Sequence, residues 1–327
     1  MVRAAWWLLR RLGFYAVAAW AALTLNFVLP RMMPGDPATA LFGRFKGELT
    51  PEAMDALRAT FGLTDEPLWR QYLGYLGHVA QGDLGVSLAY FPTPTTEVIG
   101  AGMGWTIALA GVAVVVAFVL GTGLGAMAAW RRGGPLDTIG PPITALLSSF
   151  PYFWLAMLSV YVLAFRLDWF PVRHAYGLNV VPGWSLEFVG SVASHAILPA
   201  LTMVVASTGG WMLAMRNVSV GTLGEDYVGY ALARGLSSRR ILVHYVARNA
   251  ILPNLTGFGM ALGFVVSGAL LTEVVFSYPG TGYLLLQAVR SQDYPLMQGL
   301  FLAITLAVLG ANWLADVATV VLDPRTR

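Results

Sequence analysis

Few of the residue types that usually carry catalytic chemistry occur in this chain of 327 residues. It has no cysteine, so disulfides, thiolate metal sites and cysteine nucleophiles are excluded. Its four histidines, His78, His174, His195 and His244, form no H-E-x-x-H or other metal-binding spacing. Lys46, its single lysine, lacks the glycines and the Ser or Thr of a phosphate-binding loop. The sequence therefore predicts neither an enzyme active site nor a nucleotide-hydrolysing site of that type.

Polar residues inside two apolar stretches are the next candidates for a function, because charges and free backbone polar groups are costly in an apolar environment. Glu273 precedes the turn at 276–282, which contains Tyr278 and a Pro-Gly pair and which we expect to be a re-entrant loop. The other stretch carries a polar and aromatic cluster. It consists of Ser148, Ser149, Pro151, Tyr152, Phe153 and Trp154. Pro151 can kink its helix and free a backbone carbonyl, with plain helix packing as the alternative role.

A third candidate is the polar segment 216–250, which is longer than a connection between two helices requires. Thr222 and Glu225 have the spacing of a capping box, which predicts that a helix starts at Asp226. Gly235 is expected to end this helix in the left-handed backbone conformation.

This expected helix of about ten residues is too short to be stable alone in water. It must therefore dock, either onto the ends of the chain's own helices or into a groove on a partner protein. A second helix is expected to start near Ser237 or Ser238 and to run to Asn249.

The composition shows what kind of protein must position these residues. Hydrophobic residues make up 57% of the chain and charged residues 11%, with a mean hydropathy of +0.65, whereas about 25% charge is usual in soluble domains. Windows of roughly 20 apolar residues without a central charge mark candidate membrane spans. Six such windows cover approximately residues 12–29, 105–130, 139–165, 196–215, 251–276 and 296–322. The sequence thus predicts an all-α membrane protein with six transmembrane helices.

The distribution of basic residues indicates an orientation. Six spans place both ends of the chain on one side of the membrane. If the N-terminus is cytoplasmic, the inner segments hold 12 of the 20 Lys and Arg residues and the outer segments hold 8. Because Lys and Arg accumulate in cytoplasmic loops, we expect both termini to be inside.

Small residues recur at four-residue spacing in two of the expected spans. Gly121 and Gly125 lie in one, and Gly259, Gly263 and Ser267 in another. Such stripes let helix backbones approach closely in lipid, where packing drives helix association. We expect them to mark helix contacts rather than the lining of a pathway.

Several short motifs along the chain resemble those of one protein family. In the polar segment they are Asp226-Tyr227, Ala231-Leu232-Ala233-Arg234-Gly235-Leu236-Ser237 and Arg248-Asn249-Ala250-Ile251-Leu252-Pro253. Elsewhere they are Arg10-Arg11-Leu12, Pro34-Gly35-Asp36-Pro37, Gly82-Asp83-Leu84-Gly85-Val86-Ser87, the run from Gly268 to Gly282, Asp293-Tyr294-Pro295 with Gln298-Gly299, and Leu322-Asp323-Pro324-Arg325. The first set resembles the EAA loop, and the others the first permease subunit, of the dipeptide/oligopeptide permeases of binding-protein-dependent ABC importers.

The resemblance implies a type I ABC importer permease fold with three parts. These are an N-terminal tail and first helix over 1–30, an external cap region over 31–103 and a core permease domain over 104–327, with the coupling loop at 216–250. Within the cap, helices are expected at 51–61 and 67–79.

The family also implies a set of partners. They are a second homologous permease subunit, two cytoplasmic ATP-binding subunits, an extracytoplasmic substrate-binding protein that docks on the cap, and membrane lipid; no nucleic acid is implied. ATP and Mg²⁺ would be bound by the partner ATPase subunits, with no cofactor on this chain. The expected location is a bacterial or archaeal cytoplasmic (inner) membrane.

In the family the EAA loop forms a coupling helix that sits in a cleft of the ATP-binding subunit. The corresponding residues here are Glu225, Asp226, Tyr227, Ala231, Ala233, Arg234, Gly235, Leu236, Ser237 and Arg239. The general EAA pattern ends in Ile-x-Leu-Pro about ten residues after its glycine, where this chain has Tyr245, Ala247 and Arg248. The geometry of that turn is therefore expected to differ from the general pattern.

The resemblance assigns the translocation pathway to the polar groups in the apolar stretches. Glu273 would attract the amino terminus of a peptide or pair with an arginine of the second permease subunit. Two alternatives stay open. An ion-gradient-driven secondary transporter would need its own intramembrane ion site, and the same permease role would also suit a nickel chelate, glutathione or an oligosaccharide as cargo.

Overall fold

A computed structural model describes residues 2–32, 50, 66–268 and 270–322 of the chain. Most of the described residues are helical, with one isolated bridge between Val86 and Pro94 and no other strand pairing among them. The all-α class expected from the sequence is confirmed. The expected helix at 51–61 lies outside the described residues, and the one at 67–79 is present as α4 (Leu68–Ala80).

The chain divides into two compact units. The first contains the residues up to Trp105 together with Pro279–Gly310, and the second contains Thr106–Tyr278 together with the part of the last helix from Ala311. The region expected to be the core, 104–327, is therefore shared between the two units.

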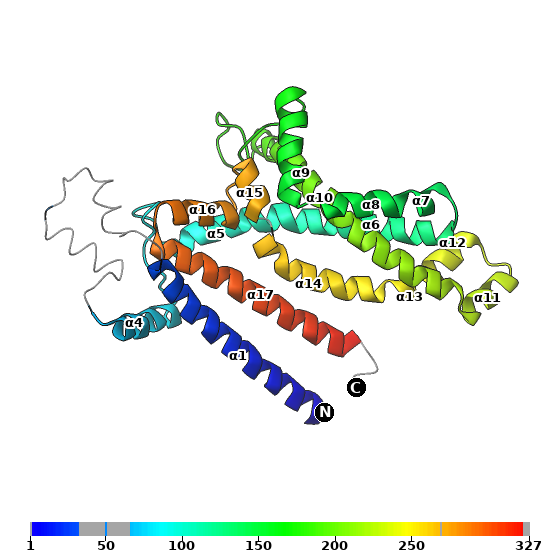
Figure 1. Ribbon diagram of the computed structural model, residues 1–327, viewed down its shortest axis with the longest axis horizontal. Coiled ribbons are helices and arrows are strands. Elements are labelled where there is room, and N and C mark those ends of the chain that lie inside the picture. The colour runs from blue at the N-terminus through cyan, green and yellow to red at the C-terminus, as the bar shows by residue number, and fades with distance from the viewer. Residues whose placement is uncertain (1, 33–49, 51–65, 269, 323–327) are drawn as a thin grey trace. The chain divides into compact units, whose positions relative to one another are not determined.

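The described helices of the first unit are labelled in Figure 1. They are α1 (Val2–Arg31), α4, α5 (Thr95–Thr106), α16 (Thr281–Arg290) and most of α17 (Tyr294–Leu322). The end of α1 is fixed to α4 by aromatic contacts, since the Phe27 ring lies 5.2 Å from that of Tyr72 and 5.7 Å from that of Tyr75. The Arg31 guanidinium lies 3.7 Å over the Phe27 ring and donates to Gln71. Burial raises the pKa of Tyr75 to about 12, so this hydroxyl stays neutral at physiological pH.

The second unit contains the remaining elements. They are η1 (Ile107–Gly111), α6 (Val112–Trp130), α7 (Pro135–Thr138), α8 (Gly140–Ser149), α9 (Tyr152–Ser159), η2 (Val160–Arg166), α10 (Leu186–Leu223), α11 (Asp226–Ala233), α12 (Ser238–Arg240), η3 (Ile241–Ala247), α13 (Arg248–Ala250), α14 (Leu252–Gly268) and α15 (Leu270–Phe276). Here α6 and α10 pack along each other, as the glycines of α6 predict. A Cβ atom at Gly121 would lie 2.5 Å from Cβ of Trp211 and 2.6 Å from the Thr208 carbonyl oxygen.

Four helices of the described chain are long and apolar enough to cross a membrane, or five if one bent pair counts as a span. They are Arg10–Arg31, Thr95–Trp130, Leu186–Leu223 and Tyr294–Leu314. The bent pair is Pro135–Ser149 with Tyr152–Arg166, which meet at 92°. The window 139–165 is therefore not one straight helix, because Phe150 is extended and Pro151 removes a backbone donor. The window 251–276 contains α14, of 17 residues, followed by α15.

Candidate coupling loop and buried polar sites

The polar segment after α10 forms the short helix that the sequence predicts, but with a different cap. The helix α11 begins at Asp226, as expected. Thr222, however, lies in the last turn of α10, where its hydroxyl donates to the Val218 carbonyl at 3.0 Å. Glu225 is the N-cap residue and makes no side-chain cap bond. The capping-box prediction is therefore wrong, because α10 continues through Leu223 and occupies the position that the box would need.

The end of α11 follows the prediction. Gly235 has a φ of +70°, the left-handed conformation that glycine adopts without a steric penalty. Two backbone bonds close the helix, from Gly235 N–H to the Leu232 carbonyl at 2.9 Å and from Leu236 N–H to the Ala231 carbonyl at 3.3 Å. The second helix starts at Ser238, directly after Ser237.

One face of α11 packs onto the chain itself. Val228 and Ala231 are 0% and 2% exposed and form a cluster with Ile241 and Val246 of η3. Further hydrophobic side chains pack against this cluster. They are Trp130, Leu223, Leu236, Leu242 and Tyr245. The cluster supplies the burial that a helix of 8 residues needs to be stable, and it places Ala231 and Leu236, which we expected among the coupling residues, on the inner side of the loop.

The opposite face of α11 is exposed. Positions 226, 229, 230 and 233 lie together on this face because they are spaced by three or four residues. We call these residues, Asp226, Gly229, Tyr230 and Ala233, the outer stripe; all are exposed, and Tyr230 is 74% exposed. The exposed side chains of Tyr227 and Leu232 flank the stripe, and Asn249 donates to the Tyr227 hydroxyl at 3.1 Å.

An ion pair fixes the helix that leads into this loop. Arg216 of α10 donates through Nε to Asp137 of α7 at 2.5 Å, and the Asp137 carboxylate also accepts from Gly133 N–H at 2.9 Å. The two residues are 79 positions apart, so no local pattern in the sequence indicated the pair. The contact ties the start of the segment 216–250 to the end of α6 through α7.

The cluster at 148–154 lies at the bend between α8 and α9. Ser148 donates to the Ala206 carbonyl of α10 at 3.0 Å, and Ser149 donates to the Ala145 carbonyl of its own helix at 2.8 Å. The rings of Phe150 and Trp154 stack with centroids 5.0 Å apart. Both hydroxyls are thus used within the fold, as the packing alternative expects, while Pro151 does break the helix.

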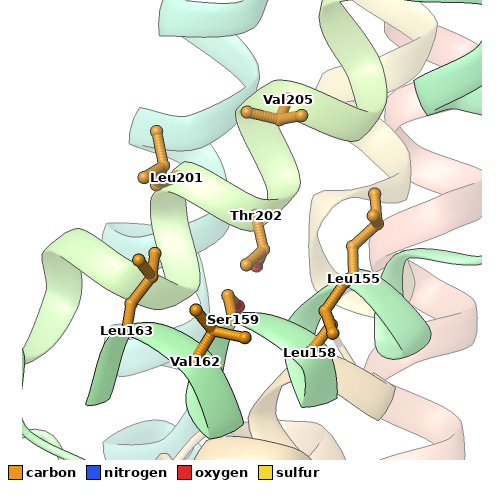
Figure 2. Close-up of a pocket in the computed structure, with 8 residues that line it drawn as sticks. All are labelled: Leu155, Leu158, Ser159, Val162, Leu163, Leu201, Thr202 and Val205. Atoms are coloured by element: carbon orange, nitrogen blue, oxygen red, sulfur yellow. The ribbon is translucent and has the colours of Figure 1, made fainter. Parts of the chain in front are cut away.

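An apolar cavity of about 300 Å³ lies directly after this bend, between α9–η2 and α10 (Figure 2). Its lining consists of Leu155, Leu158, Ser159, Val162, Leu163, Leu201, Thr202 and Val205. The only hydroxyls among these are occupied, since Ser159 donates to the Ala156 carbonyl at 2.9 Å and Thr202 to the Pro199 carbonyl at 2.8 Å. The cavity therefore suits an apolar surface rather than a charged ligand.

Glu273 and Tyr278 of the second unit are both buried. They are 0% and 1% exposed, and the Thr106 hydroxyl donates to the Glu273 carboxylate at 2.6 Å. Within the described chain, the Glu273 carboxylate thus has a hydrogen-bond donor in Thr106. The sequence marked Glu273 as a polar group that needs a partner, but nothing in it indicated Thr106.

Replacing Glu273 with glutamine is expected to preserve assembly and at least half of the transport rate, because an amide oxygen still accepts from Thr106. Glu273→Ala is expected to destabilise the chain by about 3 kcal/mol, through a lost hydrogen bond and a cavity. Thermal unfolding of the purified complex and uptake into vesicles measure both effects. A glutamine variant that assembles normally but does not transport would show instead that the pathway requires the charge.

The first unit contains a buried carboxylate that the sequence reading did not select. Asp293, just before α17, accepts from the Ser87 hydroxyl at 2.5 Å, from Ala89 N–H at 2.9 Å and from Leu296 N–H at 3.0 Å. Burial raises the pKa of this carboxyl, and the donors offset part of the rise. Ser87 and Asp293 belong to two of the motifs that carried the family resemblance, and the structure shows that these motifs contact each other.

Asp293→Ala is expected to lower the free energy of unfolding by about 3 kcal/mol, because it leaves buried donors of Ser87, Ala89 and Leu296 without an acceptor. The matched control is Asp83→Ala, since Asp83 is exposed and, among the described residues, its carboxylate bonds only to Gly85 N–H and to His78 at 3.1 Å. That control should cost less than about 1 kcal/mol. Equal thermal stability of the two variants in detergent would contradict the structural role of Asp293.

Comparison with known proteins shows the family to which the chain belongs. Residues 121–327 match the family described as the binding-protein-dependent transport system inner membrane component. The chain belongs to this family and is an integral inner-membrane component of a transport system.

Relatives cover nearly the whole chain. A Brucella suis protein named as a peptide permease is 38% identical over 94% of each chain. The dipeptide transport system permease protein DppB of Escherichia coli is 32% identical over 98% of each chain, and the oligopeptide transport system permease protein AppB of Bacillus subtilis is 31% identical over 92% of each.

Proposed function

We propose that this chain is the transmembrane subunit of an ATP-driven importer and forms half of a translocation pathway for short peptides. Family membership and the peptide transport systems named for its relatives support this role. The observation that carries it is the construction of α11. One face is anchored by Val228 and Ala231, and the opposite face presents an exposed stripe centred on Tyr230.

The partners follow from this role. The outer stripe of α11 would enter a groove on one of two ATP-binding subunits, as a short helix does in helix-in-groove recognition. ATP and Mg²⁺ would act in those subunits, which supply the phosphate-binding loop that this sequence lacks. A second, homologous permease subunit would complete the pathway, and an extracytoplasmic binding protein would deliver the peptide to the region 31–103.

For the mechanism we propose alternating access. Closure of the paired ATP-binding subunits would move α11, and its anchor on η3 would transmit that movement to the membrane helices. The ion pair between Arg216 and Asp137 supports this route, because it links the base of α10 to α7. The apolar cavity between α9–η2 and α10 would accept a helix of the second permease subunit or lipid.

Uptake by the reconstituted complex in vesicles tests the proposal. A labelled dipeptide should accumulate when ATP is supplied on the side of the membrane that carries the ATP-binding subunits and the binding protein is supplied on the opposite side. An ion gradient without ATP should give no uptake. Competition by unlabelled dipeptide, nickel chelate, glutathione or oligosaccharide identifies the cargo class. Accumulation driven by the ion gradient alone would reject the ATP-driven role.

For the orientation we propose that both termini and α11 face the cytoplasm, which the arginine distribution supports. The absence of native cysteine allows a direct test with single cysteines at Ser237 and Trp184, which are both exposed. A membrane-impermeant thiol reagent should label Trp184→Cys in intact cells and Ser237→Cys only after permeabilisation. The reverse labelling pattern would show that both termini and α11 face the outside.

A further inference from the structure

A second cavity of about 550 Å³ lies at the end of α6, beside α7 and α12. These elements lie together at one end of the second unit (Figure 1). The cavity is lined by Met127, Trp130, Arg131, Gly134, Pro135, Leu136, Ser238, Arg239 and Leu242. Its volume is in the range of sites that hold small molecules, about 300–1,000 Å³. Most lining residues are apolar, and the two charged ones are Arg131, which follows α6, and Arg239 of α12.

The two arginines carry uncompensated charge within the part of the chain that the structure describes. Neither Arg131 nor Arg239 forms an ion pair with a described carboxylate. Asp137, the acidic residue nearest in sequence to the lining residues of α7, is already engaged by Arg216 and by Gly133 N–H. The cavity lining therefore combines two arginines that have no described carboxylate partner with mainly apolar side chains.

The position of the cavity relative to the membrane selects the ligand. The span Thr95–Trp130 ends at Trp130, so this residue and Arg131 lie at the expected level of the lipid headgroups, where tryptophan and arginine are both favoured. We propose that the cavity binds an anionic phospholipid, with its phosphate between Arg131 and Arg239 and the start of its acyl chains against Met127, Leu136 and Leu242. Basic pockets next to membrane helices bind anionic headgroups through this combination of charge and apolar surface.

The bound lipid would also support α11. Trp130 and Leu242 line the cavity and pack against the cluster that anchors Val228 and Ala231. Occupation of the cavity would therefore stabilise the side chains against which α11 packs. This site concerns lipid binding alone, so it can be tested whether or not the cargo is a peptide.

The experiment uses the purified transporter complex in a neutral detergent, titrated with phosphatidylglycerol or phosphatidylcholine and analysed by native mass spectrometry. Wild type should bind phosphatidylglycerol in preference to phosphatidylcholine. The double variant Arg131→Gln/Arg239→Gln should bind phosphatidylglycerol about 25-fold more weakly than wild type, since each basic residue near a headgroup contributes roughly fivefold. Ser238→Trp, which fills the cavity and keeps both charges, should also reduce binding.

The matched control is Arg132→Gln/Arg240→Gln, which removes the same charge from exposed neighbours that do not line the cavity. This control should retain the wild-type lipid affinity. The proposal is overturned if the control loses as much affinity as the cavity variant, or if Arg131→Gln/Arg239→Gln and Ser238→Trp bind phosphatidylglycerol as wild type does. It is also overturned if inorganic phosphate displaces the lipid at millimolar concentration, which would show an anion site without a lipid component. A third contradicting outcome is that wild type and Arg131→Gln/Arg239→Gln bind phosphatidylglycerol equally once the ATP-binding subunits are removed, which would assign the arginines to a protein contact.

Discussion

Tyr230→Ala is expected to lower ATP-dependent peptide uptake at least tenfold and to abolish the stimulation of ATP hydrolysis by the binding protein. Tyr230 is 74% exposed at the centre of the outer stripe of α11, so its truncation costs the fold of this chain little. Exposed tyrosines are frequent energetic centres of protein interfaces, where truncation typically costs 2 kcal/mol or more. In the proposed mechanism, loss of that contact would prevent the ATP-binding subunits from moving the coupling loop.

Two variants of the same helix make this result specific. Tyr230→Phe retains the ring and should keep most of the coupling. Ala231→Asp places a charge in the buried cluster beside Val228 and Ile241, so it should reduce the amount of assembled complex rather than uncouple it. The yield of purified complex, its ATPase activity and vesicle uptake are measured together. If the binding protein stimulates ATP hydrolysis normally in Tyr230→Ala, the outer stripe is not part of the coupling interface.

Gly121→Leu is expected to prevent accumulation of the folded chain in the membrane. A Cβ atom at this position would lie 2.5 Å from Cβ of Trp211 and 2.6 Å from a backbone oxygen of α10, distances that a neighbouring side chain cannot relieve by rotating. The helices α6 and α10 would have to separate, and Gly125, one turn later, faces α10 in the same way, with Met215 Cβ 2.9 Å from its own Cβ position. Overpacking of this kind costs about 3 kcal/mol or more, a large part of the stability of a folded domain.

The same substitution two residues away is the control. A Cβ atom at Gly123 meets nothing within 4 Å, so Gly123→Leu should accumulate and transport like wild type. Both variants add the same apolar side chain to the same helix, and they differ only in the face that carries it. The amounts of the two variants in the membrane are compared by immunoblot, and their melting temperatures are compared in detergent. Equal levels of the two variants would mean that α6 and α10 do not pack through Gly121.

The sequence predicted features that depend on neighbouring residues. The apolar windows indicated where the long helices lie, because a bilayer span requires a continuous run of apolar residues. Gly235 indicated the end of α11 and Pro151 a break in its helix, since both effects arise within one or two turns of the residue concerned. Gly121 and Gly125 indicated a close helix contact, because their spacing places two small residues on one face of α6, but not that the partner is α10. The general role also followed from local motifs, because the residues that define the family are consecutive.

The prediction failed where a neighbouring element competed for the same residues. Thr222 has the type and spacing of a helix cap, yet the preceding helix extends over it, since an amphipathic helix gains more from continued packing than one side-chain bond supplies. The motif predicts Ala231 among the coupling residues, and nothing in the structure tests that role. Its burial against η3 is a property of the folded loop, which a motif does not specify.

By itself the sequence determined that this protein is an α-helical membrane permease with a short helix, ended by Gly235, between two of its apolar stretches. Only the tertiary structure decided which face of that helix is available, and which polar groups are joined across the chain. Ser87 reaches Asp293 over 206 positions and Thr106 reaches Glu273 over 167. Such pairs form because buried polar groups must find partners inside the fold, and the sequence shows the need for a partner but not which residue will meet it.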